Sequence, residues 1–169
     1  LHYEAFRTWQ GFVLPLVTAL MAVAWGMGIM GLVGRPLDIF NSPTPILILA
    51  VAAGHAVQLL KRYYEEYEKL RSGPSPLPQY EANREAVVRS MVYAGPVMVI
   101  AGSVAALGFL SLLVFQVETI RTFGLFTAIG IAGAVVLEMT FIPALRSMLR
   151  PPSDQDRDVE SRLRIWDRI

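Results

Sequence analysis

The feature that most constrains this chain is a set of four long segments with almost no charged residues. They run over about residues 11–33, 46–60, 90–115 and 123–145, and Glu138 is the single Asp, Glu, Lys or Arg within them. Each segment is apolar around the whole helix, whereas a surface helix of a soluble protein keeps a polar face. Three of them exceed the roughly 20 residues that a helix needs to cross a bilayer. The sequence therefore predicts an all-α, polytopic bundle of four membrane-spanning helices.

Composition agrees with a membrane protein, since 54% of the residues are hydrophobic and the mean hydropathy is +0.46. The chain has no cysteine, which removes disulfides and thiolate chemistry, and its two histidines lie on separate segments without metal-ligand spacing. No Ser-His-Asp arrangement or nucleophile elbow is visible. We therefore expect neither an enzyme nor a metal or cofactor, and no nucleic-acid partner.

The second segment is short, and a highly charged stretch follows it over residues 61–89. The side chains of Lys61, Arg62 and Tyr63 can carry the helix through the membrane interface by snorkelling. The proline-rich centre at residues 71–78 cannot continue a helix. We expect this linker to form two short interfacial helices around a proline-rich turn.

Lysine and arginine residues are distributed unevenly among the connecting segments. Thirteen lie in residues 1–10, 61–90 and 146–169, and only Arg35 and Arg121 lie on the opposite side. The positive-inside rule then places both chain ends and the central loop in the cytoplasm. We interpret the first ten residues as the end of a preceding helix with its loop, and the last 24 as a connector with one apolar face. The start lacks a methionine and a signal-peptide pattern, so we expect a piece of a longer protein.

Two titratable side chains lie inside the predicted spans, His55 in the second and Glu138 in the fourth. Because such groups are costly to place in a bilayer, they indicate function by default. Both spans run in the same direction, and each group lies roughly 9 to 12 Å inside the predicted cytoplasmic end, so the two could meet. A His–Glu pair could exchange a proton near neutral pH. We predict a proton relay; the alternatives are a neutral imidazole satisfied by a neighbour and a protonated Glu138 that holds helices together.

Three uncharged polar side chains in the spans could belong to the same region. Gln58 follows His55 by three residues and so shares its helical face, while Ser103 and Thr140 lie in the third and fourth spans. Their first interpretation is hydrogen bonding that supports packing. The functional hypothesis is a polar lining for the relay.

Small residues recur in the spans, where they let helix backbones approach closely. The G-x-G-x-x-G pattern at residues 26–31 lacks the preceding strand and soluble helix of a dinucleotide site, so close packing or local flexibility is the better interpretation. We expect the third and fourth spans to pack inside the bundle. The glycines assigned to helix packing are Gly28, Gly102, Gly130 and Gly133.

Several short motifs together resemble a known family. They are FRTW at 6–9, GLVGRPLDIF at 31–40, LILAVAAGHAVQ at 47–58, KRYYEE at 61–66, AALGFLS at 105–111, IRTFG at 120–124 and FIPALR at 141–146. The chain resembles the resistance-nodulation-division (RND) superfamily, and within it the exporters of hydrophobic and lipid-like molecules related to the mycobacterial large membrane proteins (MMPL) and to sterol-sensing domains. The likeness covers nearly the whole chain.

The resemblance implies a position within a larger transporter. The four spans would be the third to sixth helices of a six-helix repeat, with a first helix and a large extracytoplasmic domain upstream. Many members carry an aspartate in a Gly-x-Asp-Tyr context in the span that here contains Ala53, Gly54, His55 and Ala56. Gly54 falls at the position of that aspartate and His55 beside it, so the relay role is carried to His55 by neighbourhood and not by identity.

The resemblance and the residues lead to one main functional hypothesis and two alternatives. The main hypothesis is the membrane module of an RND-type secondary transporter for hydrophobic or lipid-like substrates, driven by protons in a bacterial inner membrane. The first alternative is a sterol-sensing-like module that binds lipid and regulates without pumping, and the second is a structural subunit. The expected partners are the bilayer, an amphiphilic substrate, the remainder of the transporter and a further copy of the chain.

Overall fold

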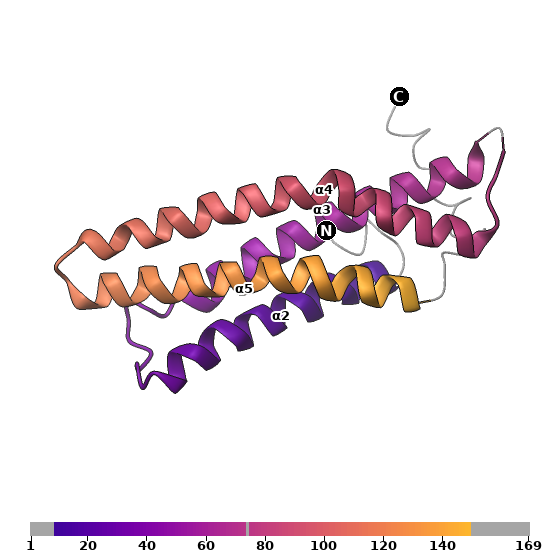
Figure 1. Ribbon diagram of the computed structural model, residues 1–169. Helices are drawn as coiled ribbons and strands as arrows, with labels where there is room; N and C mark the ends of the chain where they lie inside the picture. The colour runs from indigo at the N-terminus through magenta and orange to yellow at the C-terminus, as the bar shows by residue number, and fades with distance from the viewer. Residues whose placement is uncertain (1–8, 74, 150–169) are drawn as a thin grey trace, which may run out of the picture.

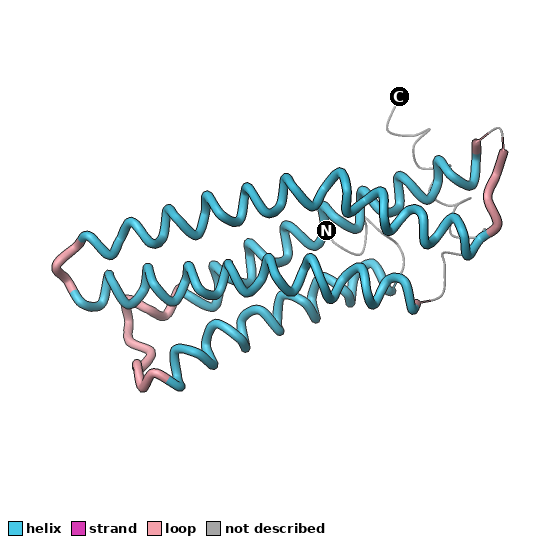
Figure 2. The backbone as a smooth tube through the Cα atoms, viewed as in Figure 1, coloured by secondary structure: helices cyan, strands magenta, loops and turns pink. Residues whose placement is uncertain are grey.

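A computed structural model describes residues 9–73 and 75–149 of the chain. Within these residues the chain forms helices and no strand (Figures 1 and 2). The predicted ends of the chain, including the apolar face of the last 24 residues, lie almost wholly outside the described part. The helices are α2 (Trp9–Leu32), α3 (Thr44–Ser72), α4 (Gln79–Leu110), the short 3-10 helix η1 (Ser111–Val114) and α5 (Glu118–Met148).

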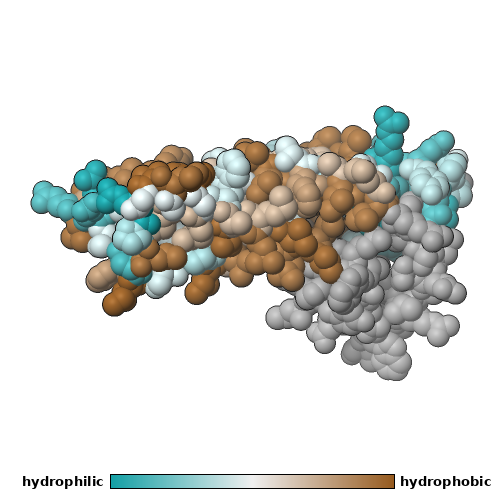
Figure 3. All heavy atoms as spheres, turned by 90° about the horizontal axis from the view of Figure 1, so that it is seen from below, coloured by the Kyte–Doolittle hydropathy of each residue, from teal (hydrophilic) through white to brown (hydrophobic). Residues whose placement is uncertain are grey.

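All four long helices are long and apolar enough to cross a membrane, which confirms the predicted all-α transmembrane bundle. The space-filling view agrees, because the middle of the visible face is apolar and hydrophilic residues gather toward its two ends (Figure 3). Polar side chains therefore lie where headgroups and water would meet the bundle.

The helices form an up-and-down bundle, and α3 and α5 make more contacts with the other helices than α2 and α4 do. Each of these two packs against the other and against both α2 and α4 (Figure 1). We call the end with the turn between α3 and α4 the hairpin end, and the end with the α2–α3 and α4–α5 connections the loop end. Because one helix separates α3 from α5 along the chain, these two run in the same direction.

The charged linker differs from its prediction. Residues 61–72 and 79–89 are not separate interfacial helices, since α3 runs unbroken to Ser72 and α4 begins at Gln79. The two extensions pack on each other through a buried cluster of Tyr63, Tyr67, Ala82 and Ala86. Burying these side chains stabilises a continuous helical hairpin, and only the Gly- and Pro-rich turn interrupts it.

The α3–α5 contact, which we call the seam, keeps one register from end to end. Three hydrogen-bonded pairs join α3 to α5, and the two members of each pair differ by 83 in residue number. They are Thr44 with Thr127, His55 with Glu138, and Tyr63 with Arg146. A constant offset is what parallel helices produce when equivalent side chains meet at each turn. The seam therefore alternates polar pairs with apolar layers.

Glycines set how closely the helices approach. A Cβ at Gly130 would overlap Ile48 of α3, one at Gly102 would overlap Val135 of α5, and one at Gly133 would lie 2.6 Å from Trp25 Cδ1. The packing role expected of Gly28 belongs instead to Gly26, where a Cβ would lie 3.1 Å from the Cα of Gly130. Gly28 is exposed and would meet nothing within 4 Å, because it lies on the outer face of α2.

Candidate functional site

The site is a pair of titratable side chains in the middle of the seam. His55 Nδ1 lies 3.1 Å from Glu138 Oε2, so the structure brings the two predicted relay residues into hydrogen-bond contact. The Glu138 side chain is fully buried and that of His55 is 12% exposed. The second carboxyl oxygen, Oε1, is also buried and has no hydrogen-bond partner among the described residues.

Apolar layers enclose the pair along the bundle axis. On the loop side lie Ala52 and Ala134, which belong to a buried cluster with Ile48. On the hairpin side lie Leu59 and Ile142, which belong to a second buried cluster. A charge that is buried in such surroundings is costly unless it is paired, so the contact between imidazole and carboxyl stabilises both groups together.

Helix α4 also contributes to the site, through a glycine that leaves room for the imidazole. Gly102 of α4 is buried, and a Cβ there would lie 3.6 Å from His55 Cε1. The absence of a side chain at this position lets α4 lie directly over the imidazole, where it limits the ring's freedom to move.

The pair can hold one proton in more than one arrangement. In the ion pair, the protonated Nδ1 donates to the carboxylate; in the neutral pair, either the carboxylic acid donates to Nδ1 or the Nδ1–H donates to the acid's carbonyl oxygen. All of these keep the net charge of the pair at zero. Adding or removing one proton changes that net charge within an apolar interior, which gives the pair a large effect on its surroundings.

The predicted polar lining does not surround the pair. Gln58, Ser103 and Thr140 are all exposed on the surface of this chain. The Oγ1 of Thr140 donates to the carbonyl of Val136 at 2.7 Å, one turn earlier in its own helix. The prediction for Gln58 is wrong because its side chain lies on the outer face of α3. Leu59, the next residue, is the one that lies in the seam.

A second buried polar layer, which the sequence did not reveal, lies two turns toward the hairpin end. Arg146 is only 2% exposed and donates through Nη2 to the hydroxyl of Tyr63 at 3.0 Å. Its guanidinium carbon lies 4.5 Å from the centre of the Tyr63 ring. The Tyr63 hydroxyl in turn donates to Asn83 Oδ1. This chain of hydrogen bonds ties α5 to α3 and α3 to α4.

A signal for that layer existed in the spacing of the sequence. Arg146 follows Glu138 by eight residues and Tyr63 follows His55 by eight, so both new residues repeat the offset of the pair. Eight residues correspond to a little over two helical turns and return to the same face. In the sequence, Arg146 was interpreted only as a positive charge that indicates orientation, so its spacing from Glu138 was not considered.

The loop end of the seam holds two further polar contacts. Thr127 Oγ1 lies 3.4 Å from Thr44 Oγ1 in a buried position. Glu118 forms an ion pair with Arg35 in the α2–α3 connection. The fold thus brings Arg35 to Glu118 from a segment that is distant in the sequence. Among the described residues no group of three His, Asp or Glu could hold a metal ion.

Comparison with known proteins assigns the chain to a family. The sequence matches the MMPL family over residues 5–169, nearly its whole length. The chain belongs to the MMPL family. This agrees with the RND-related resemblance of its motifs.

Two relatives of the chain have names that describe them as membrane proteins. MJ1562 of Methanocaldococcus jannaschii is 31% identical over 140 residues, which cover 83% of this chain and 34% of the relative. ActII-3 of Streptomyces coelicolor is 26% identical over 171 residues, which cover 94% of this chain and 22% of the relative. The matched region thus spans about a third or less of the length of these relatives. No solved structure matches it significantly.

Proposed function

We propose that this MMPL-family chain is the membrane module of an RND-type secondary transporter that moves hydrophobic or lipid-like substrates and is driven by protons. The observation that carries the proposal is the buried contact between His55 and Glu138. Membership of a transporter family supports it. Intramembrane ionisable pairs are the usual elements of proton relays in such proteins.

Protonation of the pair would act on helix packing. The contact joins α3 to α5, which lie at the centre of the bundle. A change of net charge between them alters the free energy of their present register, and an alternative packing of α5 becomes favoured. The remainder of the transporter, which the greater length of both relatives suggests, would convert that movement into substrate movement.

The orientation belongs to the proposal. The excess of lysine and arginine on one side supports an orientation with the hairpin end and both chain ends in the cytoplasm. We expect the protein to lie in a bacterial inner membrane and to work with the other transmembrane half and the extracytoplasmic domains. Association with a further copy of the chain is compatible with this arrangement.

The test uses proteoliposomes that contain the full-length protein. A fluorescent phospholipid analogue and a set of lipophilic dyes serve as probes, and their movement is measured with an imposed proton gradient and after the gradient is collapsed by an ionophore. A transporter moves at least one probe only while the gradient exists. Binding of the phospholipid analogue without any gradient-dependent movement would overturn the proposal in favour of a sterol-sensing-like binding module.

A further inference from the structure

Three consecutive layers of the seam run from Glu138 toward the hairpin end. Glu138, Ile142 and Arg146 follow one another at intervals of four residues on α5, and His55, Leu59 and Tyr63 face them on α3 with the same offset of 83. Eight residues of helix correspond to about 12 Å. A proton that leaves the pair toward the hairpin end therefore has one apolar layer to cross before it reaches polar groups.

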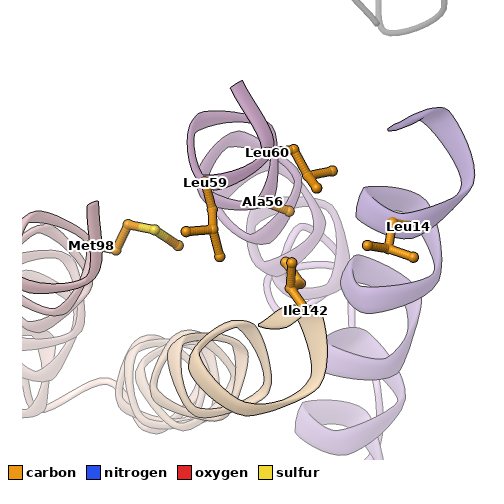
Figure 4. Packing of buried hydrophobic residues seen from close by; sticks show 6 residues of the cluster. All are labelled: Leu14, Ala56, Leu59, Leu60, Met98 and Ile142. Atoms are coloured by element: carbon orange, nitrogen blue, oxygen red, sulfur yellow. The ribbon is translucent and has the colours of Figure 1, made fainter. Parts of the chain in front are cut away.

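The apolar layer closes the bundle on all sides. Leu59 and Ile142 are each 2% exposed, and they form one buried cluster with Met98 of α4 and Leu14 of α2 (Figure 4). Each of the four helices thus contributes a side chain to the same cluster. Such a layer excludes water, and without water protons cannot pass.

A small cavity lies on the hairpin side of this layer. Its volume is about 10 Å³, which is near the lower limit for one water molecule. Leu59 and Ile142 form part of its wall together with Tyr63, Ser90 and Arg146, and the surface that lines it is almost wholly apolar. The polar groups of the hairpin end therefore come within one layer of the relay.

The opposite direction is longer and more tightly packed. Eleven residues separate Glu138 from Thr127, the next polar layer toward the loop end. Ile48 and Ile131 lie fully buried between them, and Gly26 and Gly130 bring α2 and α5 into direct contact beside Ile48. In this conformation the hairpin side is the thinner barrier.

We propose that Leu59 and Ile142 form the cytoplasmic gate of the relay, and that Arg146, Tyr63 and Asn83 are positioning residues that hold this gate closed. Their hydrogen bonds fasten α5 to α3 and α3 to α4 directly behind the apolar layer. Opening the gate requires α3 and α5 to separate there, so these hydrogen bonds must break or exchange partners. The inference rests on the proposed function, because a gate is needed only where the pair exchanges protons with water.

The experiment measures access from the hairpin side to a reporter beside the pair. This chain has no cysteine, so Ala56→Cys, next to His55 and fully buried, introduces one reporter once any cysteines elsewhere in the full-length protein are replaced. A small, membrane-impermeant thiol reagent is applied to the cytoplasmic side of vesicles. With the gate intact, we expect slow labelling.

Three variants in this background decide the question. Leu59→Ser lets water into the layer and should raise the labelling rate at least about tenfold. Tyr63→Phe keeps the core volume but removes the hydroxyl that bonds to both Arg146 and Asn83, and it should raise the rate at least about fivefold, the factor expected when both hydrogen bonds are lost. Ile48→Ser, in the equivalent apolar layer on the loop side, is the matched control and should leave labelling from the cytoplasmic side unchanged.

The outcomes separate this inference from the proposed function. Equal labelling rates in Tyr63→Phe and the parent, or equal increases in Leu59→Ser and Ile48→Ser, would overturn the gate even if proton-driven transport is established. Faster labelling in Tyr63→Phe and Leu59→Ser alone supports the gate. If the labelling results support the gate but transport does not depend on the proton gradient, the proposed function is wrong. The gate then controls the entry of water or of another solute to the bundle interior.

Discussion

Arg146 donates a 3.0 Å hydrogen bond to Tyr63, and the two residues are separated by the same 83 positions as His55 and Glu138. Two buried polar contacts with one offset mean that α3 and α5 lie in a single axial register over this part of the bundle. A shift of α5 by one turn would break both contacts together. The seam is therefore suited to two discrete arrangements in place of a gradual slide.

The first prediction concerns the contribution of the His55–Glu138 contact to stability. His55→Ala leaves the buried carboxyl of Glu138 without its partner and should lower the free energy of unfolding by about 1 to 3 kcal/mol. The double variant His55→Ala with Glu138→Leu should recover much of that loss, because no unpaired carboxyl then stays in the core. Thermal unfolding in detergent measures both. If the loss of stability in the double variant equals the sum of the losses in His55→Ala and in Glu138→Leu, the two side chains do not interact and the contact is contradicted.

The second prediction tests glycine packing on two helices. Gly130→Ala places a methyl group against Ile48 and should destabilise the bundle by about 1 to 3 kcal/mol. Gly28→Ala is the control, since a methyl group there meets no neighbour and raises helix propensity. Combining Gly130→Ala with Ile48→Ala should restore part of the stability. Equal effects of the two glycine substitutions would refute this account of the packing.

The third prediction compares the loss of stability at a buried arginine of the seam with that at an exposed arginine of the α2–α3 connection. Arg146→Ala removes a hydrogen bond and a cation–π contact from the interior and should cost about 2 to 4 kcal/mol of unfolding free energy. Arg35→Ala removes an ion pair whose side chains are 46% and 73% exposed, so we expect a change below about 1 kcal/mol that salt reduces further. A larger loss of unfolding free energy in Arg35→Ala than in Arg146→Ala would contradict this prediction.

The fourth prediction fixes the orientation. Single cysteines at Ser75, in the α3–α4 turn, and at Ser42, in the α2–α3 connection, are both exposed at opposite ends of the bundle. An impermeant thiol reagent applied to intact cells should label the second and not the first. The reverse pattern would invert the orientation and move the proposed gate to the outer side.

The sequence was sufficient to predict the spans and the meeting of His55 with Glu138. Long charge-free segments report the bilayer directly, and His55 and Glu138 are conspicuous because ionisable groups are rare there. It did not separate Gly26 from Gly28, because α2 is apolar all round and carries no signal of which face meets another helix. The continuous hairpin was missed because the charges of residues 61–89 suggested the interface, while the buried tyrosine and alanine cluster that extends the helices depends on pairing across the turn.

The polar lining and the Arg146 layer were missed for a related reason. Gln58 shares a broad face with His55 on a helical projection, yet the seam is narrow enough to include Leu59 and exclude Gln58. The axial register of α3 against α5 depends on the lengths of the loops and on contacts such as Gly130 with Ile48, which no single segment encodes. Once one pair is placed, the offset of 83 locates the others.

The measurement that tests the central claim most directly is proton movement coupled to substrate in proteoliposomes of the full-length protein. A pH-sensitive dye inside the vesicles reports protons, and a probe that the wild-type protein moves serves as substrate. We predict that both His55→Ala and Glu138→Gln abolish substrate-coupled proton movement, while Thr140→Val, an exposed neighbour on α5, retains it. Wild-type proton coupling in either relay variant would contradict the account.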